Sequence, residues 1–404
     1  MFRLAIITSH PIQYYAPWFR YLATATDLTV RVFYLWDFGI TPQSDRQFNQ
    51  TFQWDIPLLA GYDYEFVPNT SDRPGTSHFW GLQNPTLIPQ VWAFQPDAVL
   101  LMNYNYASLY RFLACWRETP LLFRGDSHRL VPETGVKAAL KRHWITQIYR
   151  RFDACLYVGQ ANRAYFEYHG VGDERLFFSP HAIDNDRFLT QAETAAIAAQ
   201  QWKQELGIPP THPVILFAGK LIPKKRPLDL LHAFLRADLP DTALLFVGSG
   251  ELEATVREAA QQSGHPHIYF APFQNQSQMP RTYAAGDVVV LPSYGSGETW
   301  GLAINEAMCL GKAAIASDHV GCAADLIKPG ETGLVFPAGD VDALAKCLQI
   351  ALQGVQSDRK GLPPQKSDRQ RLQTWGWAGQ QHIQRYSYQE STKGLVAALS
   401  AQCR

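Results

Sequence analysis

The residues best suited to chemistry on a charged ligand lie in the segment Leu291–Glu306. A Gly/Ser-rich loop there joins an apolar run to a helical pattern that is expected to begin near Thr299. Glu298 stands just before that start, and Glu306 lies about two turns inside the helix. The first amides of a helix lack intrahelical partners and lie at the positive end of its dipole, so they suit a phosphate. The amides in question are those of Trp300, Gly301 and Leu302. The alternative is an ordinary glycine loop with an exposed Glu306.

A second loop concentrates positive charge. The turn Gly219–Pro227 follows another apolar run and holds four cations, Lys220, Lys224, Lys225 and Arg226. Lysines that share a crevice with a helix start suit a diphosphate, whose charge must be stabilised. The alternative is a solvated basic turn. A third loop, Val247–Glu251, contains part of a GxGxxG pattern, but it lacks the third glycine and is a weak dinucleotide signal.

Polar residues also end two apolar runs of the first half. Thr8–Tyr15 carries His10, Gln13 and Tyr14, which are expected either to line a ligand crevice or to form an ordinary polar turn. Leu121–His128 ends with Asp126 and His128. Either of these two residues is a candidate to hydrogen-bond a substrate, and the alternative is a capping Asp126 beside a surface His128.

Short apolar runs that alternate with helical patterns must position these loops. The runs are continuous in Val, Ile, Leu and Phe, as in parallel strands that are covered on both faces. They predict an α/β protein with two doubly wound domains. The predicted strands are Leu4–Thr8, Leu28–Tyr34, Ala98–Met102, Pro120–Phe123, Ala154–Val158, Leu176–Ser179, Val214–Ala218, Ala243–Val247, Ile268–Phe270, Val288–Leu291 and Ala313–Ala316.

The predicted domains are 1–190 and 191–385, followed by a C-terminal helix in 386–404 that is expected to pack back on the first domain. The breaker Gly207–Pro210 lies close to the first boundary. A polar stretch, 354–369, is predicted to precede the C-terminal helices.

Composition limits the class of protein. The 404 residues are 46% hydrophobic and 18% charged, with 36 Lys+Arg against 36 Asp+Glu, so no basic footprint favours nucleic acid. No apolar stretch of about 18 residues is present to span a bilayer. Six cysteines without a CxxC pair are expected to be reduced thiols rather than disulfides or metal ligands. The expected location is cytoplasmic.

Together, the loops resemble the nucleotide-binding half of GT-B glycosyltransferases of the retaining family 4, the "glycosyl transferases group 1" domain. The family's Glu-x7-Glu motif is similar to Glu298–Glu306, and its basic turn is similar to Gly219–Lys225. The stretch Gly330–Asp340 resembles the family's closing strand and helix entry. The resemblance implies a GT-B fold, with two Rossmann-like domains and the active site in the cleft between them.

The resemblance also implies a function, that of a hexosyltransferase of the EC 2.4 class. A sugar passes from a nucleotide-diphosphate sugar to a hydroxyl acceptor, with retention at the anomeric carbon. No Asp-x-Asp metal motif accompanies the nucleotide site, so no obligatory metal or other cofactor is expected. Glu298 would hold the donor sugar, Glu306 the ribose, and Lys220 and Lys225 the diphosphate. Residues 299–302 would cover the phosphates, namely Thr299, Trp300, Gly301 and Leu302.

Three departures from the family pattern qualify this reading. The family's usual Arg is Lys220, which keeps the charge but loses the bidentate fork. The stretch Gly321–Asp325 departs from the usual Gly-Gly-x-x-Glu, and it is expected to touch no proposed chemistry. The family's catalytic His aligns with Asp126, two residues before His128. The alternatives to a transferase are therefore a GT-B nucleotide-sugar 2-epimerase and a non-catalytic nucleotide-sugar-binding protein.

Three features concern the acceptor. In a GT-B protein, His10, Gln13 and Tyr14 would lie on the acceptor side of the site. Seven of the eleven tryptophans fall in the first 150 residues, where they either form an acceptor site or pack in the core. Residues 136–151 carry five Lys/Arg, no acid and an apolar stripe of Val136, Ala139/Leu140, Trp144 and Ile148. Such a helix either lies on an anionic membrane surface, where a membrane-linked acceptor is found, or faces the core with a solvated basic side.

Overall fold

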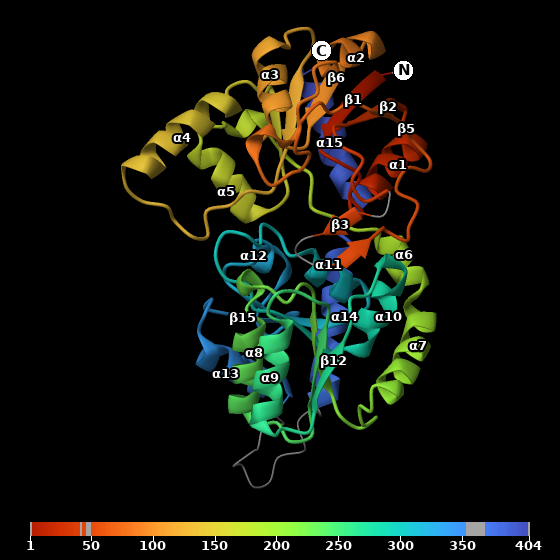
Figure 1. Cartoon of the computed structure of the whole chain (residues 1–404), viewed down its shortest axis with the longest axis vertical. Helices are drawn as coiled ribbons and strands as arrows, with labels where there is room; N and C mark the ends of the chain where they lie inside the picture. The colour runs from red at the N-terminus through yellow and green to blue at the C-terminus, as the bar shows by residue number, and fades with distance from the viewer. Residues whose placement is uncertain (1, 41–42, 46–49, 353–367, 403–404) are drawn as a thin grey trace. The chain divides into compact units, whose positions relative to one another are not determined.

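A computed structural model describes residues 2–40, 43–45, 50–352 and 368–402 (Figure 1). The chain divides into two compact units. Unit 1 comprises Met1–Gln43, Thr51–Asp184 and Ser387–Arg404, and unit 2 comprises Ser44–Gln50 and Asn185–Tyr386. Cys403 and most of the polar stretch 354–369 lie outside the described residues.

Unit 1 is built on a seven-stranded sheet in the order β5-β2-β1-β6-β7-β8-β9, in which every neighbouring pair is parallel. The strands are β1 (Phe2–Thr8), β2 (Leu28–Tyr34), β5 (Asp63–Phe66), β6 (Ala98–Leu101), β7 (Leu121–Arg124), β8 (Ala154–Tyr157) and β9 (Leu176–Phe178). The short strands β3 (Gln43–Asp45) and β4 (Gln50–Phe52) form a separate pair.

Helices cover both faces of this sheet (Figure 1). They are α1 (Ala16–Ala25), η1 (Phe79–Gly81), α2 (Leu87–Phe94), α3 (Ala107–Cys115), α4 (Val136–Tyr149), α5 (Gln160–Tyr168), η2 (Asp173–Arg175) and α15 (Tyr388–Gln402). Alternate residues of β1 enter different cores, Ala5 and Ile7 on one face and Leu4 and Ile6 on the other. Leu395 of α15 joins the second core, so the C-terminal helix is part of unit 1.

Unit 2 repeats the architecture with six parallel strands in the order β12-β11-β10-β13-β14-β15. The strands are β10 (Val214–Ala218), β11 (Ala243–Val247), β12 (Ile268–Ala271), β13 (Val288–Leu291), β14 (Ala313–Ser317) and β15 (Gly333–Phe336). The helices are α6 (Asn185–Thr190), α7 (Ala192–Glu205), η3 (Pro223–Lys225), α8 (Pro227–Ala237), α9 (Glu253–Ser263), η4 (Gln276–Gln278), α10 (Met279–Ala285), α11 (Leu302–Cys309), α12 (Ala323–Leu326), α13 (Val341–Leu352) and α14 (Asp368–Ile383).

The predicted fold class is confirmed, because both halves are parallel sheets with helices on their faces. Ten of the eleven predicted strands coincide with an observed strand to within one residue at either end, and the predicted Leu4–Thr8 lies within β1, which begins two residues earlier at Phe2. The edge strand β5 was not predicted. Its residues Asp63 and Tyr64 are exposed, and alternating polar and aromatic residues do not give the continuous apolar run of a buried strand.

Candidate active site

The topology of unit 2 indicates where a ligand binds. The chain leaves β10 toward β11 on one side and later returns to β13 on the other. Ligands of open α/β sheets bind beyond the carboxyl ends of strands at such a reversal of strand order. The loops that follow β10 and β13 are the basic turn and the Gly/Ser loop, so the fold brings the two predicted segments to one place.

The helix after β13 begins later than the sequence predicts. Helix α11 starts at Leu302, not near Thr299, because Gly301 has a left-handed φ of 101° and interrupts the helix. A side chain at Gly301 would meet Val320 and Leu291 within 3 Å, so glycine is required there. The amides at the helix start are therefore those of Leu302 and Ala303 rather than Trp300 and Gly301. Thr299 and Trp300 belong to the loop before the helix.

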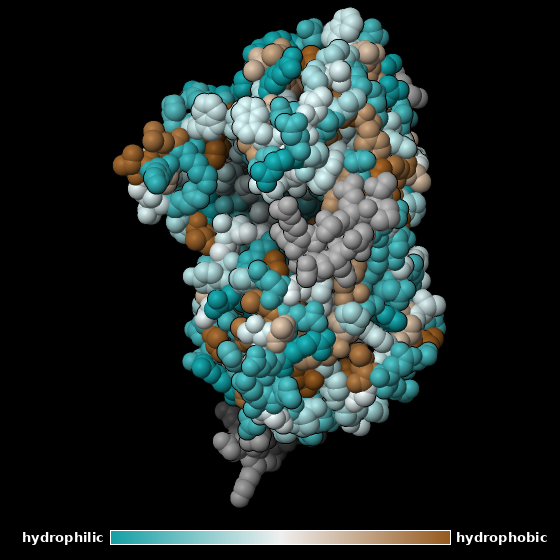
Figure 2. Space-filling model, in the orientation of Figure 1, coloured by the Kyte–Doolittle hydropathy of each residue, from teal (hydrophilic) through white to brown (hydrophobic). Residues whose placement is uncertain are grey.

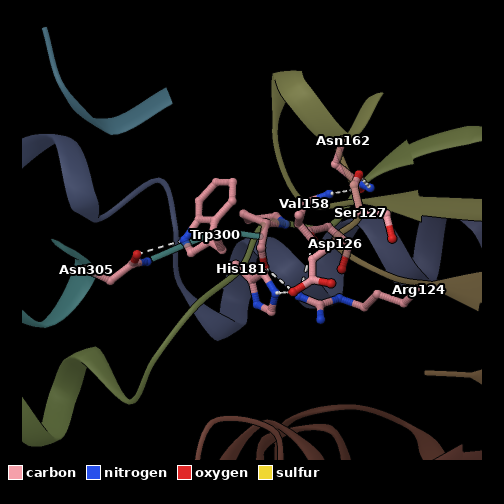
Figure 3. A network of polar contacts seen from close by, with 10 residues as sticks. Arg124, Asp126, Ser127, Val158, Asn162, His181, Trp300 and Asn305 are labelled. Carbon is pink, nitrogen blue, oxygen red and sulfur yellow. Dashed lines mark hydrogen bonds and ion pairs between the residues drawn. The ribbon is translucent and has the colours of Figure 1, made fainter. Parts of the chain in front are cut away.

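The Trp300 side chain has a structural position. It is 3% exposed, and its indole N–H donates to Oδ1 of Asn305 at 2.9 Å (Figure 3). This bond ties the loop before α11 to the helix itself. The loop is thereby fixed at the point where the amides of α11 begin.

Glu298 is held by partners from both loops. Its Oε2 lies 2.5 Å from Nζ of Lys225 and accepts a hydrogen bond from Oγ of Ser293 at 3.0 Å. Burial alone would raise the pKa of Glu298, but the charge and hydrogen bond of Lys225 outweigh it, so the pKa lies below its usual value. Glu298 is therefore an anion at neutral pH, positioned beside the basic turn.

Glu306 is buried in α11, with 1% of its surface exposed. The alternative of an exposed Glu306 is wrong. Burying a carboxylate costs free energy, and folding alone gives no reason for that cost. A buried acid of this kind is typical of a binding site. Glu306 thus lies in α11, and Glu298 lies in the loop that precedes this helix.

Close backbone approach shapes the basic turn. A Cβ at Gly248 would lie 2.1 Å from the carbonyl oxygen of Gly219, and one at Gly250 would lie 2.5 Å from that of Leu221. The amide of Leu221 donates to the carbonyl of Ser249 at 2.9 Å. The glycines after β11 therefore serve to seat the basic turn, which explains the partial GxGxxG pattern without a dinucleotide. Lys220 and Lys225 of the turn are half-buried.

One expectation about this unit is wrong. The stretch that begins at Gly321 was expected to touch no proposed chemistry, yet its amides support the Glu298 loop. Gly321 N–H donates to the carbonyl of Glu298 at 3.1 Å, and Cys322 N–H donates to that of Trp300 at 2.9 Å. A Cβ at Gly321 would lie 1.8 Å from the carbonyl oxygen of Thr299, so the close contact depends on glycine.

In unit 1, the loop after β1 holds the three residues predicted on the acceptor side. The His10 ring packs edge-on against Trp36 and Phe38, with centroids 5.9 and 5.5 Å apart. Burial lowers the pKa of His10 to about 4, so the ring is neutral at pH 7. Gln13 and Tyr14 are half-buried, and the carbonyl of Tyr14 accepts from the Tyr388 hydroxyl at 3.0 Å.

Asp126 lies at the carboxyl edge of the same sheet, close to a residue that the sequence did not indicate. Its Oδ2 is 3.3 Å from Nε2 of His181, which follows β9 (Figure 3). The Asp126 side chain is 34% exposed and that of His181 is 3% exposed. His128 is buried rather than on the surface, and its Nδ1 accepts the Leu130 amide at 3.3 Å.

Asn162 of α5 fixes the loop that carries Asp126. Its Nδ2 donates to the carbonyl of Ser127 at 2.7 Å, and its Oδ1 accepts the amide of Val158 at 3.0 Å (Figure 3). The loops after β7 and β8 are thus joined through one buried amide side chain. No motif links Asn162 or His181 to Asp126 in the sequence, so spacing gave no signal for either.

Helix α4 presents an apolar row to solvent. Val136, Leu140 and Trp144 are 78%, 67% and 57% exposed, whereas Ile148 is buried. Figure 2 shows hydrophobic side chains gathered over the outer part of α4. The alternative of a fully core-facing apolar stripe is therefore wrong for three of its members. Among the described residues, no helix is both long and apolar enough to cross a membrane.

Comparison with known proteins agrees with this geometry. Residues 198–360 match the family model described as glycosyl transferases group 1. A D-inositol 3-phosphate glycosyltransferase of Nocardia farcinica is 29% identical over 250 residues, which are 59% of this chain and 50% of that protein. A GDP-mannose-dependent alpha-(1-6)-phosphatidylinositol monomannoside mannosyltransferase of Mycolicibacterium smegmatis is 28% identical over 56% of this chain and 61% of its own length. The chain thus spans about half to three-fifths of the length of these relatives.

Solved structures match over almost the whole chain. Anabaena Alr3699/HepE in complex with UDP and glucose has a TM-score of 0.71 at 18% identity, covering 99% of this chain and 100% of its own. WaaG, a glycosyltransferase involved in lipopolysaccharide biosynthesis, has a TM-score of 0.62 at 17% identity, covering 98% and 99%. Residues 198–360 are thus similar to the glycosyl transferases group 1 family, and the chain has the GT-B fold of these solved structures.

Proposed function

We propose that the protein is a glycosyltransferase that moves a sugar from a nucleotide-diphosphate sugar to a hydroxyl acceptor. The observation that carries this proposal is the ion pair of Glu298 with Lys225 at the reversal of strand order, inside the family-matched segment. An anion beside a basic turn and a helix start provides partners for both halves of a sugar diphosphate. The names of the relatives and the UDP complex of a structural neighbour support the same class.

In this proposal, each residue has a separate role. Glu298 accepts hydrogen bonds from the donor sugar, and Glu306 accepts those of the ribose. Lys220, Lys225 and the first amides of α11 stabilise the diphosphate. Helix α11 begins at Leu302. The three residues before it therefore contribute through the shape of their loop, namely Thr299, Trp300 and Gly301.

The reaction follows from those contacts. The bond between the anomeric carbon and the phosphate oxygen breaks while the acceptor oxygen forms its bond on the same face of the sugar. The acceptor proton passes to the departing phosphate oxygen, so configuration is retained without a protein nucleophile. Positive charge from two lysines and the helix amides stabilises the leaving diphosphate, so we expect no requirement for a divalent cation. His10, Gln13 and Tyr14 are the proposed acceptor-side residues, and Asp126 or His128 contacts the sugar.

Thermal unfolding with UDP-, GDP- and ADP-sugars tests the donor site. A ligand at about 100 times its dissociation constant should add about 2.7 kcal/mol to the free energy of unfolding. We expect that stabilisation for one nucleotide with the wild type and its loss in Glu306→Ala. A product that carries the sugar then excludes an epimerase and a non-catalytic binding protein. No stabilisation by any of the three would contradict the donor site.

We further propose that unit 1 contacts an anionic membrane surface on the cytoplasmic side through 136–151. The exposed row on α4 continues into a chain of aromatic rings. The Trp144 indole donates to the Tyr110 hydroxyl at 3.0 Å and stacks on that ring, and Phe79 lies edge-on to Tyr110 at 5.2 Å. Trp80, 61% exposed, lies 4.9 Å from Phe79. Amphipathic rings of this kind are typical of membrane interfaces.

Charge complements this surface. The exposed cations of α4 and its end are Lys137, Lys141, Arg142 and Arg150, and the nearby acid Glu133 is paired with Lys141 at 2.7 Å. Basic residues near an anionic leaflet contribute about 1 kcal/mol each. Together with the apolar row, they favour a surface-bound helix rather than a spanning one.

Vesicle flotation distinguishes this proposal from a solvated helix. The wild type should float with phosphatidylcholine vesicles that contain phosphatidylglycerol and much less with phosphatidylcholine alone. Trp144→Ser should lower the bound fraction, whereas Trp92→Ser, an equally exposed tryptophan on α2, should not. Equal binding of both variants to anionic vesicles would contradict the proposal.

A further inference from the structure

A buried cluster of side chains from separate loops surrounds Asp126. Arg124, the last residue of β7, is 3% exposed and donates to the carbonyl of Pro180 at 2.9 Å. Its guanidinium also lies 4.9 Å from the centre of the Trp18 ring. Arg124 therefore fixes the backbone just before His181.

The ring of His181 also has a packing partner on its face. Tyr15, at the start of α1, stacks on it with centroids 5.9 Å apart and an angle of 3° between the planes. The Ser391 hydroxyl of α15 also donates to the carbonyl of Pro180, at 2.5 Å. Tyr15 covers one face of the His181 ring, and the backbone before His181 is anchored at Pro180. One edge of the imidazole is then directed at the Asp126 carboxylate.

Figure 3 shows the Asp126 carboxylate between the His181 ring and the Arg124 guanidinium. The carboxylate also interacts electrostatically with Arg124. Because a third of the Asp126 side chain is exposed while both supporting groups are buried, the cluster differs from an ordinary surface ion pair. It presents a carboxylate to the edge of the sheet and holds it from behind.

Resting on the proposed function, we propose that His181 is a positioning residue that donates its Nε2 proton to Asp126 and orients that carboxylate toward a hydroxyl of the transferred sugar. Burial lowers the pKa of His181, and the hydrogen bond to Asp126 offsets this in part, so the ring is neutral at pH 7. A neutral ring can donate to a carboxylate from Nε2 when the proton is on that nitrogen. Asp126 then acts as an acceptor of hydroxyl hydrogen bonds, which favours an uncharged sugar over one that carries a carboxylate.

Kinetics separate positioning from a purely structural role. His181→Leu should lower kcat about tenfold to a hundredfold, with the donor KM within about threefold, because orientation rather than nucleotide binding is lost. His181→Gln keeps an N–H donor and should recover most of the activity. The matched control is His169→Leu, another buried histidine of unit 1, which should leave kcat unchanged.

A double-mutant cycle tests whether His181 acts through Asp126. In an Asp126→Ala background, His181→Leu should produce no further loss of kcat, since the group that it positions is absent. The same fold-loss in both backgrounds would overturn the proposal and indicate a structural effect. Retained stabilisation by the nucleotide in every variant shows that the fold and the unit 2 site are intact.

Nitrogen NMR of 15N-histidine-labelled full-length protein gives a readout that does not depend on turnover. The His181 signal, identified by its absence in His181→Gln, should show a proton on Nε2 in the wild type and should shift in Asp126→Ala. A ring without a proton on Nε2 would overturn the proposal. If the wild type transfers no sugar at all, the proposed function fails, and this measurement still decides the contact between His181 and Asp126.

Discussion

The two units present their polar residues at the same edge of similar sheets, but they assemble them differently. In unit 2, the backbone does most of the assembly. Gly248 seats the basic turn, Gly321 supports the Glu298 loop, and Gly301 sets the start of α11. The groups that act on the ligand therefore lie close together in the sequence, within one or two loops.

In unit 1, side chains from three separate segments do the same work. Tyr15 stands at the start of α1, Arg124 and Asp126 at the end of β7, and His181 after β9, and the four meet at the sheet edge. Their order in the chain carries no fixed spacing. A recognisable sequence motif therefore exists where glycines and a helix start determine the geometry of a site. No such motif exists where packed side chains from distant segments determine it.

The largest effect should come from the charge pair of unit 2. Lys225→Ala removes a cation from the diphosphate and leaves Glu298 half-buried without its ion-pair partner. We expect kcat/KM for transfer to fall about a hundredfold to a thousandfold, in line with the loss of one preorganised group. Steady-state kinetics of sugar transfer, with the donor that thermal unfolding identifies, measure this loss of kcat/KM.

Lys224→Ala is the matched control for this change. Lys224 is exposed, and its Nζ donates to the Gly297 carbonyl at 3.1 Å. An exposed contact of this kind contributes little, so activity should stay within about threefold of wild type. Equal losses in the two variants would mean that the turn acts through its overall charge and not through the contact of Lys225.

The sequence predicts unit 2 better than unit 1 for the same physical reason. Continuous apolar runs predicted the strands of both sheets, because buried parallel strands require them. Glu298, Glu306 and the basic turn were visible because their spacing is set by one helix and two loops. His181 was invisible because its partner lies 55 residues away and only packing unites them. The start of α11 was misplaced because a left-handed glycine, not propensity, ends the loop.

The second effect concerns stability and tests the role of backbone contact in unit 2. Gly321→Ala places a Cβ 1.8 Å from the Thr299 carbonyl oxygen, so the main chain must move. We expect a loss of about 3 kcal/mol in the free energy of unfolding, typical of overpacking. Gly295→Ala, with a φ of 87° and open space around it, should lose about 1 kcal/mol. Urea unfolding compares the two, and a larger loss for Gly295→Ala would refute the close-contact account.

A third effect concerns the pH dependence of stability. Burial lowers the pKa of His10 and of His169 to about 4, against 6.5 for an exposed ring. Between these values the unfolded chain binds more protons than the native one, so stability falls as pH drops below 6.5. The pKa of Glu298 is lowered below its usual 4.5, so its contribution is still present at pH 5 and is lost only on further acidification.

From pH 7 to pH 5, the wild type should therefore lose about 3 to 4 kcal/mol of stability through His10 and His169 together. A double variant, His10→Gln with His169→Gln, should lose much less over the same range in urea unfolding. His232→Gln, an exposed position in unit 2, should follow the wild type. A pH dependence that is identical in all three proteins would show that unit 1 does not hold these rings neutral.

The smallest effect should follow removal of divalent cations. If Lys220, Lys225 and the amides of α11 supply the positive charge for the diphosphate, a chelator takes nothing from the site. Transfer in excess EDTA should then stay within about twofold of the untreated rate, and Lys225→Ala should stay equally insensitive. Added magnesium that restores activity to Lys225→Ala would mean that an ion can replace the lysine, which would still locate the diphosphate at the basic turn. A wild type that loses transfer in EDTA would show instead that the backbone and side chains of unit 2 do not provide enough charge by themselves.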